Sequence, residues 1–293
     1  MIMDLEQKSI ERIKLAALMS EQYYNAPLIC TYSGGKDSDV MLELFKRSGV
    51  KFEVVNSHTT VDAPQTVYHI REKFKELEEQ GIKTTIVYPT YKGKSCSMWN
   101  MIPLKGAPTR KKRWCCDLFK ENSTPGRMVA TGVRWDESLK RSEREEYETL
   151  GKSIKDKKKA TYSDLILNND NDSKRNVIER CEIKGAVVAN PIIDWKNKDI
   201  WGYIRSEKIN YNPLYDMGYS RVGCIGCPIS SYKKRCKEFF DFPKYQENYI
   251  KSFDMWILKK GSDKFKNGQE MFDWWMENPK MQGQITLFEE DIK

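Results

Sequence analysis

The sequence predicts an α/β fold, in which a Rossmann-like parallel sheet is flanked by helices and followed by a C-terminal helical extension. An apolar run at residues 28–32 leads into a glycine turn and then into residues 40–45, which have helical spacing. The alternation continues with a strand expected at 52–56, a helix at 66–80 and a strand at 84–88. Strands that alternate with helices through short links form parallel βαβ units, which bind ligands at the carboxyl ends of their strands.

The chain of 293 residues is long enough to bury a large core, and three regions are expected. Residues 1–27 should form a helix packed on the core, because their apolar side chains recur at helical spacing. Residues 28–230 should form the nucleotide-binding domain, and residues 231–293, rich in Trp and Phe, a C-terminal helical extension. Two further elements are expected in the domain, a strand at 127–131 and a short helix at 199–206, and ordered structure is expected to resume at 187–193.

Residues 151–176 break this pattern, because a lysine run is followed there by a run of Asn and Asp with little to bury. We expect an exposed insertion. A nucleic-acid-binding tongue is the less favoured interpretation, because no aromatic residues interrupt the lysines.

The composition favours an anionic ligand in a reducing compartment. Lys and Arg number 50 against 42 Asp and Glu, a net charge of +8 that does not choose between nucleotides and polynucleotides. No apolar run approaches the length of a bilayer span, and the first residues lack a signal-peptide pattern, so we expect a cytoplasmic protein without a membrane partner. Eight cysteines in such a chain favour metal binding or redox work over disulfides.

The stretch Ser33–Ser38 predicts a phosphate cradle between the first strand and its helix. Gly34 and Gly35 allow the backbone to approach a ligand closely, the helix start presents unpaired N–H groups, and Lys36 adds a positive charge. The spacing differs from a Walker A loop, which has four residues between its first Gly and its Gly-Lys pair. A glycine-rich turn with a surface lysine is the alternative. The predicted nucleotide-binding residues of this stretch are Ser33, Gly34, Gly35, Lys36, Asp37 and Ser38.

Four cysteines in two distant segments predict a metal centre. Cys115 and Cys116 are adjacent, and Cys224 and Cys227 form a Cys-x-x-Cys pair. The four thiolates could hold zinc or an iron–sulfur cluster, and an adjacent pair fits the usual spacing of zinc ligands poorly. We therefore favour a [4Fe-4S] cluster, with zinc as the less favoured occupant.

These motifs resemble a known family. The loop Ser33–Ser38 is similar to the pyrophosphate loop of the adenine nucleotide alpha-hydrolase-like superfamily. Its combination with the four cysteines resembles the cluster-bearing members of the phosphoadenosine phosphosulfate (PAPS) reductase family, notably the adenosine phosphosulfate reductases. Three further segments agree with the family in order: residues 131–138 with Arg141, residues 190–195 and residues 211–219.

The resemblance implies an adenine nucleotide, either ATP or adenosine phosphosulfate, with its phosphates on the loop. Thr59 and Gly132 are expected as further nucleotide-binding residues. The residues expected to act on the phosphates are Lys36, Asp37, Arg134 and Arg141. The guanidinium groups would grip a second anionic group, Lys36 would neutralise a leaving phosphate, and Asp37 is the candidate ligand for Mg²⁺. Ordinary salt bridges and helix capping are the alternatives for these side chains.

The sequence departs from the pattern of the family reductases in two places, and these departures decide between the functional hypotheses. Family reductases carry a catalytic cysteine in a C-terminal tail, whereas no cysteine follows Cys236 in this sequence, and Cys96 is the least implausible substitute. Residues 58–66 resemble the sulfurtransferase of bacterial DNA phosphorothioation systems, a branch thought to use ATP to activate an acceptor oxygen. The string Arg113-Trp114-Cys115 is also similar to an Arg-Trp-Cys string of that branch.

The preferred hypothesis is therefore ATP cleavage between the α and β phosphates, coupled to sulfur transfer from a sulfur donor. The first alternative is a reductase of adenosine phosphosulfate or PAPS that yields sulfite and draws on a thioredoxin-like reductant. The second is a nucleotide-binding sensor or subunit without turnover. DNA or another nucleic acid stays open as an acceptor.

Overall fold

The computed structural model describes residues 2–120, 124–137, 139–142, 144–150 and 186–276. The chain divides into two compact units. The first unit comprises Met1–Ser57, Pro64–Val87 and Thr124–Val222, and the second unit comprises His58–Ala63, Tyr88–Ser123 and Gly223–Lys293. The predicted insertion at 151–176 lies outside the described residues.

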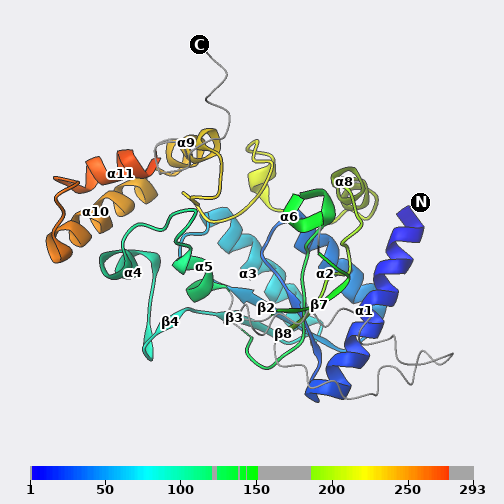
Figure 1. The fold of residues 1–293 in the computed structure, drawn as a ribbon. Helices are drawn as coiled ribbons and strands as arrows, with labels where there is room; N and C mark the ends of the chain where they lie inside the picture. The colour runs from blue at the N-terminus through cyan, green and yellow to red at the C-terminus, as the bar shows by residue number, and fades with distance from the viewer. Residues whose placement is uncertain (1, 121–123, 138, 143, 151–185, 277–293) are drawn as a thin grey trace, which may run out of the picture. The chain divides into compact units, whose positions relative to one another are not determined.

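The first unit contains a six-stranded sheet with the strand order β3-β2-β1-β6-β8-β7 (Figure 1). Its strands are β1 Leu28–Thr31, β2 Phe52–Ser57, β3 Thr84–Val87, β6 Val129–Ala130, β7 Tyr147–Leu150 and β8 Ala186–Ala189. All neighbouring strands are parallel except β7, which pairs with β8 in the antiparallel direction. The prediction of a Rossmann-like parallel sheet flanked by helices is confirmed, and the antiparallel edge strand β7 is an addition that the sequence pattern did not predict.

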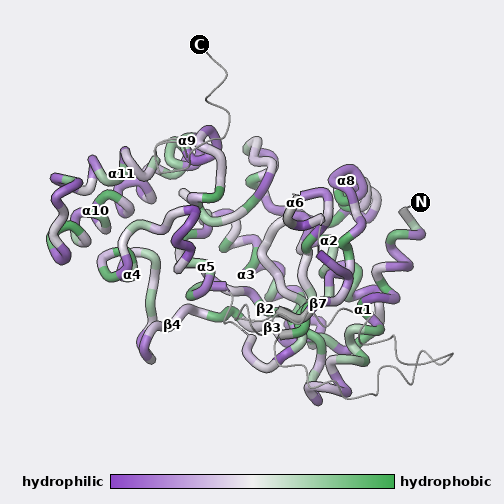
Figure 2. The backbone as a smooth tube through the Cα atoms, in the orientation of Figure 1, coloured by the Kyte–Doolittle hydropathy of each residue, from purple (hydrophilic) through white to green (hydrophobic). Residues whose placement is uncertain are grey.

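The helices of the first unit pack on this sheet and on each other. They are α1 Ile2–Tyr24, α2 Lys36–Ser48, α3 Pro64–Glu79, α6 Leu139–Ser142 and α8 Asn197–Ser206, with the short 3₁₀ helices η1 Trp135–Glu137 and η2 Pro213–Tyr215. Contacts join α1 to α2, and α2 to α8. Figure 2 shows hydrophilic and hydrophobic stretches alternating along α1, as expected of a helix with one buried face.

The core of the first unit follows from the alternation of side chains along its strands. In β1, Leu28 and Cys30 are buried in the main cluster with residues of α1, α2, α3 and α8, while Ile29 joins a second cluster with Val55 and Val188. Successive strand residues point to opposite faces of a sheet, so both faces of β1 are buried.

The second unit is mainly helical. Its elements are the hairpin β4 Thr90–Tyr91 and β5 Lys94–Ser95, and the helices α4 Met98–Lys105, α5 Trp114–Phe119, α9 Tyr232–Asp241, α10 Pro243–Lys260 and α11 Gly268–Met276. Aromatic rings form its core, where Trp275 packs against Tyr249 at 4.7 Å and against Phe253 at 5.5 Å between ring centroids. The predicted C-terminal helices are present. None of the helices that the structure describes is long and apolar enough to cross a membrane.

A buried ion pair fastens α1 to the segment after β8. Arg12 is 5% exposed, and its guanidinium donates to Asp194 through two nitrogens at 2.7 and 3.2 Å and to the Pro191 carbonyl at 3.0 Å. Lys8 adds a hydrogen bond of 2.8 Å to Asp194. Burial tends to raise the pKa of Asp194, but the hydrogen bonds from Arg12 and Lys8 outweigh it and hold that pKa below the usual value.

We expect Asp194→Asn to destabilise the protein by about 1–3 kcal/mol at neutral pH, because hydrogen bonds to charged groups are lost. The carboxylate has a lowered pKa in the folded state, so its contribution is present above the unfolded pKa and is lost as pH falls through the folded one. Urea unfolding at several pH values checks this. A wild-type advantage that does not shrink in acid would contradict the assignment.

Candidate nucleotide site and four-cysteine group

The loop between β1 and α2 has the backbone geometry of a phosphate cradle. Gly34 has φ +70°, a region that residues with a side chain rarely adopt, and an added Cβ would meet Ile70 Cγ1 at 2.9 Å. Gly35 precedes the first turn of α2, where Ser38 Oγ donates to the Gly35 carbonyl at 2.7 Å. The helix N-terminus is thus placed directly after a strand of the parallel sheet, where a phosphate is favoured.

Two side chains from a distant segment hold this loop in place. The Tyr215 hydroxyl accepts the backbone N–H of Lys36 at 2.9 Å. Asn212 is fully buried, and its Nδ2 donates to the Gly34 carbonyl at 2.8 Å and to Thr66 Oγ1 at 3.0 Å. Tyr215 therefore occupies one N–H that the helix start would otherwise offer to a ligand.

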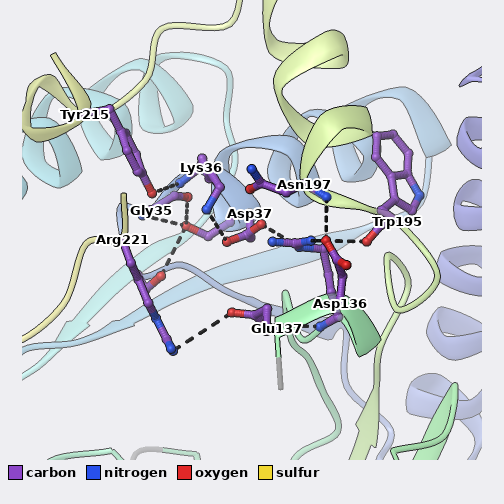
Figure 3. A network of polar contacts seen from close by, with 12 residues as sticks. Gly35, Lys36, Asp37, Asp136, Glu137, Trp195, Asn197, Tyr215 and Arg221 are labelled. Atoms are coloured by element: carbon purple, nitrogen blue, oxygen red, sulfur yellow. Dashed lines mark hydrogen bonds and ion pairs between the residues drawn. The ribbon is translucent and has the colours of Figure 1, made fainter. Parts of the chain in front are cut away.

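Asp37 joins two cations at the start of α2 (Figure 3). Arg134 is 2% exposed, and its Nε donates to Asp37 Oδ1 at 2.7 Å, while Lys36 Nζ lies 3.5 Å from Asp37 Oδ2. Arg134 Nη1 also donates to the Trp195 carbonyl at 3.2 Å. Both carboxylate oxygens of Asp37 face cations, so a metal ion there would compete with Lys36. The role of Asp37 as a Mg²⁺ ligand stays a prediction.

A second carboxylate, Glu137, gathers the remaining arginines of this site. It forms an ion pair with Arg141 and lies 4.0 Å from Arg221, and one of its oxygens accepts the backbone N–H of Arg134 at 3.2 Å. The predicted residue Gly132 lies against the start of α2, where an added Cβ would be 3.4 Å from the carbonyl carbon of Asp37. Lys36, Asp37, Gly132, Arg134 and Arg141 therefore belong to one neighbourhood.

The electrostatics of this neighbourhood favour an anion. Burial lowers the pKa of Lys36, against the opposing influence of Asp37. Burial and the adjacent Arg221 lower the pKa of Arg141 to about 10, which leaves it charged at neutral pH. The four cations Lys36, Arg134, Arg141 and Arg221 share three carboxylates, because Asp136 lies 3.6 Å from Arg134 in addition to Asp37 and Glu137, and a phosphate would relieve the repulsion between the cations.

A buried polar cluster lies behind the loop. Tyr32 donates to Asp39 Oδ1 at 2.5 Å, and His69 Nε2 lies 3.1 Å from the same oxygen. All three side chains are less than 5% exposed. Asp39 Oδ2 has no hydrogen-bond partner among the residues that the structure describes. Because Tyr32 directly precedes Ser33 and Asp39 follows Ser38, this cluster fixes both ends of the loop.

The four predicted metal ligands lie together in the second unit. Cys115 and Cys116 lie in the first turn of α5, and Cys224 and Cys227 bracket a turn in which the Cys227 N–H donates to the Cys224 carbonyl at 3.3 Å. All four are free and partly buried thiols. A hydrogen bond with Cys116 is the largest cause that raises the pKa of Cys115, followed by burial and by the charges of the other three cysteines. The four thiols therefore lie within electrostatic reach of one another.

The chemistry of the donor set, four thiols, fits a soft metal centre. Thiolates select zinc, Cu(I) and iron–sulfur clusters. No three His, Cys, Asp or Glu side chains within the described ranges converge closely enough for one metal ion. A [4Fe-4S] cluster on the four thiols therefore stays a prediction.

Two cations, Arg113 and Lys120, flank the adjacent cysteines. Arg113 Nη2 lies 3.4 Å from Cys116 Sγ. A hydrogen bond with Cys115, opposed by burial and supported by Arg113 and Lys120, lowers the pKa of Cys116 to about 5. Cys224 is the largest cause that raises the pKa of Lys120. The predicted substitute nucleophile Cys96 is buried, and burial raises its pKa, which makes a poor nucleophile.

The turn between Cys224 and Cys227 is held by two buried side chains. Glu238 Oε2 accepts the Gly226 N–H at 2.8 Å, and the Tyr249 hydroxyl donates to the Ile225 carbonyl at 3.0 Å. Glu238 is 3% exposed and Tyr249 is 1% exposed. These partners orient the backbone between the two thiols, a role that neighbours of metal ligands commonly serve.

We expect Glu238→Ala to lower the free energy of unfolding by about 1–3 kcal/mol, because the Gly226 N–H is left buried without an acceptor. Glu238→Gln keeps an acceptor oxygen and should recover most of the loss. Urea unfolding of both variants, with metal and labile sulfide analysis after anaerobic purification, measures the effect. Equal losses in the two variants would show that the hydrogen bond to Gly226 contributes little.

Thr59 has a partner that the sequence did not predict. It belongs to the second unit, where its hydroxyl accepts a hydrogen bond from Cys224 Sγ at 3.4 Å. Its predicted role in nucleotide binding is untested. Tyr215 and Glu137 were missed as site residues, although both lie in segments that resemble the family.

Comparisons with known proteins agree with these motifs. The family model of the phosphoadenosine phosphosulfate reductase domain matches residues 27–230. An uncharacterized protein of Methanocaldococcus jannaschii is 28% identical over 253 residues, which cover 83% of this chain and 44% of that protein. An adenosine 5'-phosphosulfate reductase of Anoxybacillus flavithermus is 23% identical over 251 residues, which cover 78% of this chain and 87% of that protein.

Among solved structures, phosphoadenylyl-sulfate reductase from Candida auris in a phosphate complex has a TM-score of 0.46 and 19% identity, covering 76% of this chain and 93% of that chain. The chain spans about half the length of the Methanocaldococcus relatives that it matches. The family model covers well over half of the chain, and its matched range contains the glycine loop, the arginines and all four cysteines. The chain therefore belongs to the phosphoadenosine phosphosulfate reductase domain family.

Proposed function

We propose that the chain binds ATP on the loop Ser33–Ser38 and cleaves it between the α and β phosphates to activate an acceptor for sulfur transfer. The observation that carries this proposal is the convergence of Lys36, Arg134 and Asp37 at the N-terminus of α2, directly after a parallel strand. Relatives in the family include enzymes that act on adenosine 5'-phosphosulfate, another adenine nucleotide with an acid anhydride bond.

The bond changes follow from this arrangement. An acceptor oxygen attacks the α phosphorus, the bond to the bridging oxygen of the β phosphate breaks, and pyrophosphate leaves with the electron pair. The Lys36 ammonium neutralises the charge that develops on pyrophosphate, and the N-terminus of α2 adds a favourable dipole. Asp37 orients the side chains of Lys36 and Arg134 through its contacts with both. Sulfur from a donor then displaces AMP from the activated acceptor.

The four cysteines would hold a [4Fe-4S] cluster in the second unit. Such a cluster supplies an iron site or electron for sulfur chemistry when it is bound. Arg113 and Lys120 favour the anionic form of Cys116, and Glu238 and Tyr249 keep the Cys224–Cys227 turn in place. Zinc is the less favoured occupant, and metal and sulfide analysis separates the two.

Reduction of adenosine phosphosulfate is the second candidate, because the relative from Anoxybacillus flavithermus carries that name and aligns over 87% of its own length. In that reaction the sulfate group would face the arginines that Glu137 gathers. Two electrons from a thioredoxin-like reductant would break the bond between sulfur and the phosphate oxygen, and sulfite and AMP would be released.

Turnover of anaerobically purified protein distinguishes the candidates. Incubation with ATP and Mg²⁺ is expected to give pyrophosphate and AMP, with an acceptor and sulfide present. Sulfite from adenosine phosphosulfate, without pyrophosphate from ATP, would overturn the proposal in favour of reduction. Lys36→Ala should abolish product, whereas Lys46→Ala, an exposed lysine of the same helix paired with Glu43 at 3.3 Å, should not.

A further inference from the structure

Almost all of the net charge of the chain lies in one segment of the second unit. Residues 88–120 contain eight Lys and Arg against one acidic residue, Asp117, a net of +7 out of +8 for the whole chain. In the rest of the chain, positive and negative residues nearly balance. A concentration of positive charge in one segment indicates a partner with repeated negative charges.

The structure gathers four of these lysines onto one surface. Lys92 Nζ and Lys105 Nζ lie 5.7 and 5.0 Å from the centre of the Tyr91 ring, so the β4–β5 hairpin meets the end of α4. Lys112 Nζ donates to the Lys105 carbonyl at 3.1 Å, which brings the next loop to the same place. Lys94 is paired with Tyr91 across the β4–β5 hairpin. We call Lys92, Lys94, Lys105 and Lys112 the basic surface.

The basic surface is open to a ligand. Lys92, Lys94 and Lys112 are exposed, and Lys105 is half-buried. None of the four forms an ion pair with a carboxylate in the part of the chain that the structure describes, in contrast to Lys46, Lys73 and Lys83, which each have a Glu partner. Unpaired lysines close together repel one another, and an anion relieves that repulsion.

The same loop connects the basic surface to the four cysteines. Arg110 Nε donates to the Pro228 carbonyl at 3.0 Å, next to Cys227, and Arg113 contacts Cys116 at 3.4 Å. The loop that carries Lys112 of the basic surface thus also carries two arginines that contact the cysteine segments.

We propose that the basic surface binds the phosphodiester backbone of a polynucleotide. Lysines at several points along a surface match a ligand with evenly spaced charges, and Tyr91 and the exposed Tyr88 offer rings on which a base can stack. A single nucleotide would use only a fraction of these charges. The consequence for chemistry rests on the proposed function: the sulfur acceptor is then a nucleotide unit of this polynucleotide.

Binding is tested with the full chain and fluorescently labelled RNA and DNA of matched sequence, by anisotropy at about 50 to 200 mM salt. We expect binding that weakens steeply with salt. Replacing all four lysines of the basic surface with alanine should weaken binding at least about tenfold and reduce the salt slope by about one for each phosphate that is no longer neutralised. The nucleic acid that binds more tightly identifies the partner as RNA or as DNA.

The matched control replaces Lys251, Lys259, Lys260 and Lys266, four exposed lysines on and after α10, and so makes the same change of charge on the same unit. The control should bind like wild type. Equal losses in the two variants, no binding by wild type, or binding to anionic phosphatidylglycerol vesicles in preference to nucleic acid would each overturn the proposal.

Pyrophosphate release from ATP separates this proposal from the proposed function. Stimulation of release by the bound polynucleotide in wild type, and not in the variant of the basic surface, supports both. Binding without any pyrophosphate release leaves the binding surface supported and contradicts the ATP reaction. Release that occurs without polynucleotide binding contradicts the binding surface alone.

Discussion

Gly226→Ala is expected to destabilise the second unit by about 2–5 kcal/mol, with loss of the metal that we propose for the four cysteines. Gly226 has φ +71°, and a non-glycine residue in this region costs about 1–2 kcal/mol. An added Cβ would lie 2.7 Å from Phe239 Cζ and 3.1 Å from both Trp275 Cη2 and Tyr249 Cε2. These rings are fully packed against one another, so relief of the overlap adds about 1–3 kcal/mol. The turn between Cys224 and Cys227 would shift with the backbone.

Gly223→Ala is the matched control, because Gly223 lies beside Cys224, has no positive φ, and has nothing within 4 Å of an added Cβ. Urea unfolding and metal analysis of the two variants measure the effect. Gly223→Ala should resemble wild type in both. Equal metal contents in Gly226→Ala and wild type would mean that the packing of this turn does not position the thiols.

The parallel part of the sheet could be predicted from sequence because its strands are short apolar runs with helices between them. The strand β1 and the helix α2 follow directly from the residues on either side of the loop. The strand β7 could not be predicted in the same way. Tyr147–Leu150 contains an acidic residue and follows a charged stretch, and its direction depends on pairing with β8, which lies far along the chain. Local pattern carries no information on such pairing.

The residues of the site that carry a motif could also be predicted, and those that act through distant contacts could not. The loop and the cysteines have characteristic spacing. The hydroxyl of Tyr215 accepts from a residue 179 positions away, and Asn212 reaches Gly34 over 178 positions. Their roles depend on the packing of η2 against α3, which cannot be predicted from the periodicity of apolar residues in the sequence. The hydrogen bond from Cys224 to Thr59 joins residues 165 positions apart, and local sequence pattern could not predict it either.

Gly34→Ala tests the loop itself, and its effect on nucleotide binding should exceed its effect on stability. Gly34 has φ +70°, and an added Cβ would meet Ile70 Cγ1 at 2.9 Å and Thr66 Cγ2 at 3.2 Å. Ile70 is a residue of α3 and is buried in the core, so the loop must move away from α3 to relieve the contact. A displacement that weakens the hydrogen bonds to a phosphate by about 1.4 kcal/mol lowers affinity about tenfold, and we expect at least this loss for ATP.

Gly49 provides the control, because it also has φ +70° but has nothing within 4 Å of an added Cβ. Gly49→Ala therefore carries the same backbone strain at the other end of α2 without the contact to Ile70. The difference in unfolding free energy between the two variants, expected at about 1–3 kcal/mol, isolates that contact. Calorimetric titration with ATP should find wild-type affinity in Gly49→Ala and a large loss in Gly34→Ala. If both variants bound ATP equally well, the phosphates would have to lie elsewhere than on the backbone of this loop.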